Sequence, residues 1–229
     1  MSYMPIQKTI AVLGGTGREG KGLVYRWAKA GYRVLVGSRT LEKAQATAHD
    51  LSSLLGVGTK IEGVSNLTAV IQADMVVLAV PYLAHRETLE AVKGLMKGKI
   101  LIDVTVPLVP PSVTRVQMPP AGSAAQEAKE ILGEEVQVTS AFQNVSYDQL
   151  LNDNPIECDV LVTGTSKEAR SETLKLVSAA GLTGWDAGPI ENSVVVEGLT
   201  SILIGINKKY GSTSAGICIK GVQAPAMES

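Results

Sequence analysis

The sequence predicts an α/β fold with a doubly wound, mostly parallel sheet and a small C-terminal helical extension. Short apolar segments alternate with segments of helical periodicity along the chain. The first apolar segment leads into a glycine cluster in which Gly15, Gly17 and Gly20 have the spacing G-x-G-x-x-G. Residues 74–80 form a continuous apolar run, which is typical of a strand buried on both faces. These features predict a Rossmann-type, dinucleotide-binding fold.

Each glycine of the cluster has a separate predicted role. Gly15 takes the backbone angles of a sharp turn that a Cβ atom would oppose. Gly17 lets a pyrophosphate approach the main chain, and Gly20 lets the following helix pack close to the strand. The start of that helix offers unpaired N–H groups and a partial positive charge to the phosphates.

The elements of the first half follow from periodicity and breakers. Predicted strands cover residues 10–13, 34–37, 60–64, 74–80 and 99–104. The first predicted helix has apolar positions from residue 23 onward and stops at Gly31. Further predicted helices cover residues 41–55, 67–73 and 82–94. Gly31 suits a left-handed terminal residue. Ser38 or Thr40 is a candidate N-cap for the second helix, and Pro81 ends the fourth strand.

The second half continues the alternation after a proline-rich loop at residues 107–120. Predicted strands cover residues 137–141, 158–163 and 182–186, and predicted helices cover residues 123–132, 166–179 and 190–206. Ser166 is the expected N-cap of its helix. Residues 224–229 are expected to be disordered. We divide the chain into a dinucleotide-binding Rossmann domain at residues 1–186 and a C-terminal region at residues 187–229 that contains the last helix.

Composition narrows the classes of function. Of the 229 residues, 45% are hydrophobic, which is enough for a core. The net charge of -1, without a basic stripe, argues against a nucleic-acid partner. No apolar run is long enough to span a membrane and residues 1–8 lack a signal-peptide core, so we expect a cytoplasmic protein without a membrane partner. The two cysteines, Cys158 and Cys218, show no metal-ligand spacing, and we expect no metal.

The end of the second predicted strand indicates which dinucleotide binds. NAD-binding chains usually carry an acid there that accepts the ribose 2′-hydroxyl. Here Ser38 and Arg39 follow the strand, Lys43 lies one turn later, and no acid occurs before Glu42. A guanidinium can bind a 2′-phosphate through two parallel hydrogen bonds. The sequence therefore favours NADP(H) over NAD(H).

Several stretches together resemble a known family over nearly the whole chain. Residues 11–22 read Ala-Val-Leu-Gly-Gly-Thr-Gly-x-x-Gly-Lys-Gly, and residues 36–44 read Val-Gly-Ser-Arg-x-x-x-Lys-Ala. Residues 80–81, 140–145 and 186–200 add further matches, the last with Asp-Ala-Gly-Pro-Ile-Glu-Asn-Ser and Glu-x-Leu-Thr. This pattern resembles the NADPH-dependent reductases of the deazaflavin coenzyme F-420.

The resemblance implies an oxidoreductase that transfers a hydride between NADP(H) and coenzyme F-420, its co-substrate. It also implies roles for particular residues. The pyrophosphate loop would be lined by the glycines together with Thr16, Arg18 and Glu19. The 2′-phosphate would be held by Ser38, Arg39 and Lys43. The nicotinamide would be bordered by Val80, Pro81, Gln143, Asn144 and Val145, and the deazaflavin would face Thr200. The two cofactors carry the reactivity, so the protein must stack their rings and exclude water. We therefore expect no catalytic residue, and only ring positioning by Val80, Pro81, Gln143 and Val145.

The chain departs from some members of that family at three positions on the deazaflavin side. Those members carry histidine at Gln143, arginine at Val194 and serine at Gly198.

The last helix is apolar on more than one face, which is typical of a buried helix or an interface, and predicts a homodimer.

Two other functions remain open from the residues alone. An NADPH-dependent reductase of a small imine or carbonyl substrate would share the fold. Such a reductase normally needs a proton donor near its substrate. The candidate donors near a strand end are Tyr82 and His85, and we expect His85 on a helix surface. A non-catalytic NADP(H)-sensing module would need only the glycine loop and Arg39.

Overall fold

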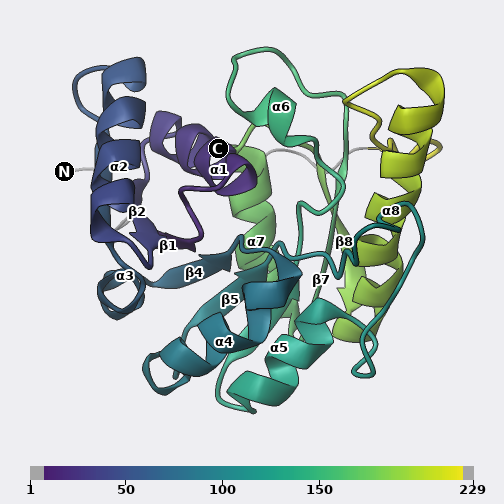
Figure 1. The fold of residues 1–229 in the computed structure, drawn as a ribbon, viewed down its shortest axis with the longest axis horizontal. Coiled ribbons are helices and arrows are strands. Elements are labelled where there is room, and N and C mark those ends of the chain that lie inside the picture. The colour runs from purple at the N-terminus through teal and green to yellow at the C-terminus, as the bar shows by residue number, and fades with distance from the viewer. Residues whose placement is uncertain (1–7, 224–229) are drawn as a thin grey trace.

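The computed structural model describes residues 8–223, which form one eight-stranded sheet with helices on both faces (Figure 1). The predicted disorder at residues 224–229 lies outside the described residues. The strands are β1 Thr9–Leu13, β2 Arg33–Ser38, β3 Lys60–Ser65, β4 Met75–Leu78, β5 Ile100–Asp103, β6 Gln137–Ser140, β7 Val160–Gly164 and β8 Gly184–Pro189. The helices are α1 Arg18–Lys29, α2 Leu41–Leu55, α3 Asn66–Gln72, α4 Tyr82–Val92, α5 Ala124–Leu132, α6 Tyr147–Leu150, α7 Lys167–Ala179 and α8 Ser193–Tyr210.

The strand order β3-β2-β1-β4-β5-β6-β7-β8 confirms the predicted doubly wound sheet. Neighbouring strands run parallel except β6 and β7, which are antiparallel. The chain winds outward from β1 to β3 and then returns to the other side of β1 as β4. The carboxyl ends of β1 and β4 are therefore neighbours, with Leu13 paired to Leu78. Such a switch point is where ligands bind in open α/β sheets.

The core lies on the two faces of this sheet, because successive strand residues point to opposite sides. Ile10 and Val12 join the cluster that contains residues of α1, α2 and α7, whereas Ala11 and Leu13 join the cluster of α3, α4 and α5. In Figure 1, α4 and α5 lie in front of the sheet and α7 lies behind it. No helix within residues 8–223 is both long and apolar enough to cross a membrane.

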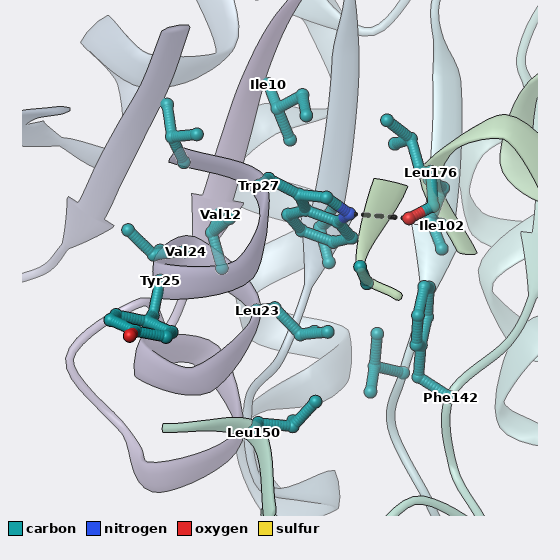
Figure 2. Packing of buried hydrophobic residues seen from close by; sticks show 14 of the residues in the cluster. Ile10, Val12, Leu23, Val24, Tyr25, Trp27, Ile102, Phe142, Leu150 and Leu176 are labelled. Atoms are coloured by element: carbon teal, nitrogen blue, oxygen red, sulfur yellow. Dashed lines mark hydrogen bonds between the residues drawn. The ribbon is translucent and has the colours of Figure 1, made fainter. Parts of the chain in front are cut away.

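Trp27 joins α1 to two distant parts of the chain (Figure 2). Its indole Nε1 donates a hydrogen bond of 2.8 Å to the carbonyl of Leu176 on α7. Its ring packs edge to face against Phe142, with centroids 5.7 Å apart and an interplanar angle of 81°. Both rings are fully buried. The helix that starts at the glycine cluster is therefore fixed to the segment that follows β6.

Helix α8 is fixed to the N-terminus of α5 by buried polar groups. The carboxylate of Glu197 accepts hydrogen bonds from the backbone N–H groups of Ala124 (2.7 Å) and Ala125 (3.1 Å). The hydroxyls of Ser123 and Ser193 lie 2.6 Å apart, and Ser123 also caps α5. These bonds satisfy N–H groups that every helix start leaves without an intrahelical partner.

Several predicted boundaries need correction. Helix α1 starts at Arg18, five residues before the first apolar position of its pattern, because its first turn belongs to the glycine loop. Neither Ser38 nor Thr40 caps α2 with its side chain. Residues 190–192 form a 3₁₀ turn before α8, and α6 was not predicted. Residue 186, where we divide the chain, lies within β8, and the division itself stays a prediction.

Candidate functional site

The glycine loop leaves β1 through a tight turn and enters α1. The left-handed residue of this turn is Gly14, with φ of +80°, and not Gly15 as expected. Gly15 is required for space, because a Cβ atom there would lie 2.9 Å from the carbonyl oxygen of Val12. At Gly20 a Cβ atom would lie 2.5 Å from the oxygen of Gly14, so this glycine lets α1 pack against the turn as predicted. Gly17 is exposed at the helix start, which has no side-chain cap, so the first N–H groups of α1 are free for an anionic ligand.

A cavity of about 420 Å³ opens beside this loop at the carboxyl ends of the central strands. Segments that are far apart in the sequence form its wall. The lining residues are Gly17, Arg18, Glu19, Ala79, Val80, Pro81, Val104, Thr105, Val106, Leu108, Gln143, Asn144, Val145, Ser146, Tyr147, Thr200, Leu203, Ile204, Asn207, Thr213 and Ala215. The volume is in the usual range for a small-molecule site.

The cavity brings together most of the residues expected near the reacting rings. All four expected ring-positioning residues, Val80, Pro81, Gln143 and Val145, are in its wall, together with Asn144 and Thr200. Of the expected phosphate-loop residues, Gly17, Arg18 and Glu19 line it, whereas Gly15, Thr16 and Gly20 do not. This separation is consistent with a loop that holds phosphates at the edge of a cavity for rings.

A strained residue directs Gln143 and Asn144 into the wall. Phe142 has φ of +73°, which is unusual for a side chain of this size, and its burial against Trp27 holds this conformation. The Gln143 amide nitrogen donates to the carbonyl of Asp103 and to the hydroxyl of Ser140, both at 2.7 Å. Its carbonyl oxygen is buried without a partner among the described residues.

Asn144 repeats this arrangement one residue later. Its amide nitrogen donates to the carbonyl of Asp159 (2.6 Å) and to the sulfur of Cys158 (3.2 Å), and its own carbonyl oxygen has no partner within residues 8–223. Since the bonds to backbone carbonyls fix which end of each amide is nitrogen, both side chains retain only acceptor capacity. The two residues therefore suit a ligand edge that carries N–H groups.

The C-terminal part of the chain closes the opposite wall. Thr200 on α8 donates from its hydroxyl to the carbonyl of Gln143 at 2.8 Å. After α8, the chain returns toward β7, where the N–H of Asp159 donates to the carbonyl of Ile217 at 2.7 Å. This return places Thr213 and Ala215 in the cavity wall.

The expected 2′-phosphate residues lie outside the cavity, at the neighbouring end of β2. Ser38 is the last residue of that strand, and its hydroxyl accepts from the N–H of Thr40 at 3.2 Å. Arg39 and Lys43 are exposed, and neither has a hydrogen bond or ion pair with another residue in the described range 8–223. The N–H of Gly14 donates to the carbonyl of Gly37, so this strand end adjoins the glycine loop. A free guanidinium beside a phosphate loop suits an additional phosphate.

Arg18 and Glu19, the first two residues of α1, both line the cavity. Arg18 donates a 2.6 Å hydrogen bond to the hydroxyl of Tyr147, and its guanidinium lies 5.1 Å from the centre of that ring. Glu19 has no such partner: its Oε1 atom is buried without a hydrogen bond to any described residue. Burial raises the pKa of Glu19 to about 8, because the ionised carboxylate loses its hydration there.

The expectation that His85 lies on a helix surface is wrong. The inner face of α4 buries it completely, and its Nε2 atom lies 2.7 Å from Oδ2 of Asp103. Burial opposes the charged form of His85, but the charge and hydrogen bond of Asp103 outweigh it and raise the pKa. Asp103 also accepts the N–H of Thr105 at 2.9 Å. Neither His85 nor Asp103 lines the cavity, and Tyr82 bonds instead to Glu127 at 2.6 Å.

Some lining residues had no detectable signal in the sequence. Tyr147 lies on a four-residue helix, and Thr213 and Ala215 lie after α8 in a segment without periodicity. Thr105, Val106 and Leu108 follow β5, at a strand end where the fold class alone predicts ligand contacts.

Comparison with known proteins gives consistent matches. Residues 9–107 match the model of the family described as NADP oxidoreductase, coenzyme F-420-dependent. An F-420-dependent NADP reductase from Methanocaldococcus jannaschii is 38% identical over 222 residues, covering 93% of this chain and 99% of the relative. The enzyme of the same name from Methanothermobacter thermautotrophicus is 37% identical, covering 92% of this chain and 94% of its own.

A solved structure agrees with the fold. A protein from Arthrobacter sp. FB24, described as a candidate F-420-dependent NADP reductase, superimposes with a TM-score of 0.77 at 22% identity. The match covers 93% of this chain and 100% of that chain.

Proposed function

Because this chain belongs to the family of F-420-dependent NADP reductases, we propose that its cavity is the place where a nicotinamide and a deazaflavin ring meet. The enzyme is an oxidoreductase that transfers a hydride between NADP(H) and coenzyme F-420. The observation that carries the site assignment is the shared wall: the glycine-loop side, the Val80-Pro81 turn, Gln143 to Val145 and Thr200 all border one space.

The pyrophosphate of NADP(H) would bind at Gly17 and the free N–H groups at the start of α1. Gly15, Thr16 and Gly20 shape this loop. Ser38, Arg39 and Lys43 would hold the 2′-phosphate, which explains why the two cations have no partner among the described residues. The ring end of the cofactor then extends from the loop into the cavity.

Inside the cavity, the protein supplies position and not a reacting group. Val80, Pro81 and Val145 present apolar surface to the stacked rings, and this surface excludes water from the hydride path. The unpartnered carbonyl oxygens of Gln143 and Asn144 would accept N–H groups, such as the carboxamide NH₂ of nicotinamide or a ring N–H of the deazaflavin. Thr200 fixes the Gln143 backbone from α8 and borders the deazaflavin side.

We also propose that the enzyme is a homodimer built partly on α8. Val195, Ile202 and Ile206 expose 71%, 51% and 40% of their surface along this helix. A monomeric mass at micromolar protein in analytical ultracentrifugation would contradict the dimer.

Two further predictions remain. One is the division into an NADP-binding part at residues 1–186 and a second-cofactor part at residues 187–229, and the other is the cytoplasmic location.

The activity is tested by mixing the enzyme with NADPH and oxidised coenzyme F-420 and following the visible absorbance of the deazaflavin. We expect bleaching that depends on enzyme concentration. Tight NADPH binding without bleaching at any pH would contradict the reaction and favour a sensing module. An imine or carbonyl reductase would instead oxidise NADPH only when such a substrate is added.

A further inference from the structure

Glu19 stands out in the cavity because a carboxyl group lies where phosphates are expected. It follows Arg18 in the first turn of α1, between Gly17 and Gly20 of the glycine loop. It lines the cavity, and its Oε1 atom is buried without a hydrogen-bond partner among residues 8–223. An ionised carboxylate here would repel the phosphates of a dinucleotide, because like charges at close range disfavour each other's ionised forms.

We propose that Glu19 acts as a neutral carboxylic acid that donates a hydrogen bond to an anionic oxygen of the dinucleotide held on the glycine loop. This inference rests on the proposed function, since it requires NADP(H) at the start of α1. A protonated carboxyl group adds an O–H donor to a site whose other donors are backbone N–H groups. Protonation of Glu19 therefore replaces the repulsion between a carboxylate and a phosphate by a hydrogen bond between them.

The cation nearest to Glu19 in the cavity wall, Arg18, is paired with Tyr147 and not with the carboxyl group. Of the residues that line the cavity with it, only Arg18 and Tyr147 carry a charged or titratable group. The guanidinium of Arg18 is turned to the hydroxyl and ring of Tyr147 on α6. The β4–α4 turn, the segment after β5, residues 143–146, α8 and residues 213–215 contribute only apolar and neutral polar groups to this wall.

The ionisation of Glu19 then controls binding. Burial raises its pKa to about 8, so the acid form dominates at pH 7 and is lost as the pH rises above 8. Bound phosphate oxygens favour the acid form further. By linkage, NADPH affinity falls by up to about tenfold between pH 7 and pH 9, and binding at pH 9 takes up a proton. The 2′-phosphate does not contribute, because a phosphomonoester with a second pKa of about 6 stays ionised throughout this range.

The test compares NADPH titrations of the wild type, Glu19→Gln and Glu168→Gln at pH 7 and pH 9. Glu168 is the matched control, because it is also the second residue of a helix, follows a lysine as Glu19 follows an arginine, and is exposed away from the cavity. The glutamine at position 19 keeps a donor and cannot ionise. We expect about a tenfold loss of affinity at pH 9 for the wild type and Glu168→Gln, and less than a twofold change for Glu19→Gln.

Calorimetry in two buffers of different ionisation enthalpy counts the protons taken up at pH 9, and needs no variant. Uptake by the wild type supports the proposal, and no uptake overturns it. An equal pH dependence in Glu19→Gln and the wild type also overturns it, because another group would then titrate. A wild type that binds no NADPH at either pH would instead remove the proposed function, so the two failures are distinguishable.

Discussion

Helices α1 and α5 each start beside a glutamate, fully buried Glu197 at α5 and partly buried Glu19 at α1, and the two carboxyl groups differ in their partners. At α5, Glu197 reaches across from α8 and accepts the N–H groups of Ala124 and Ala125. At α1, Glu19 belongs to the helix itself and has no hydrogen bond to a described residue. Burial raises the pKa of both carboxyl groups to about 8.

This difference shows that a raised pKa alone does not separate a structural carboxyl group from a functional one. At α5 the anion-binding start of the helix is already filled by the protein, so the bonds fix α8 in place. At α1 the corresponding N–H groups are left for a ligand. The hydrogen-bond partners therefore distinguish a helix start that the protein itself fills, at α5, from one without a side-chain cap, at α1.

The largest expected effect is on the α5 side. Glu197→Ala removes the acceptor of two buried N–H groups, and we expect the free energy of unfolding to fall by about 4 kcal/mol, because both N–H groups are then buried without a partner. Urea unfolding measures this loss. Glu197→Gln keeps one acceptor oxygen and should lose less. A loss below about 1 kcal/mol for Glu197→Ala would show that these bonds do not hold α8.

An intermediate effect is expected beside α1, in binding rather than stability. Arg39→Ala should weaken NADPH binding by about 2 kcal/mol, the loss of a charge-assisted pair, and leave NADH binding nearly unchanged. Fluorescence titration with both nucleotides measures the difference. Arg115→Ala, an exposed arginine of the loop at residues 107–120, is the control. Equal loss for NADPH and NADH would refute the 2′-phosphate role.

The last expected effect is on the pH dependence of stability without cofactor. The pKa of Glu19 is higher in the folded protein than its ordinary value of 4.5, so the folded state binds more protons between pH 4.5 and about 8. Stability therefore falls as the pH rises through this window and levels off above it. Glu19→Gln should show a smaller fall in melting temperature from pH 5 to pH 8 than the wild type and Glu168→Gln. An identical fall in all three proteins would mean that Glu19 does not titrate in this window.

The sequence predicts well the features whose cause is local. The glycine spacing located the turn between β1 and α1, and helix α2 has the predicted bounds because a turn and a glycine enclose an uninterrupted pattern. The position of His85 was predicted wrongly because periodicity does not show which polar residue on a helix has a buried partner. Its partner is Asp103, at the end of the following strand β5. Tyr147 and Ala215 were missed for the same reason: their positions in the cavity depend on tertiary contacts alone.

The segment after α8 has a kinetic consequence. Residues 211–223 are mostly exposed, and few bonds, such as those between Asp159 and residues 217 and 219, attach them to the sheet. Segments of this kind open locally at a much lower free energy than the sheet requires for unfolding. Because Thr213 and Ala215 form part of the wall, this opening would let a bound ring leave while the sheet stays intact. Cofactor release is then expected to follow the hydrogen-exchange rate of this segment and not the global unfolding rate.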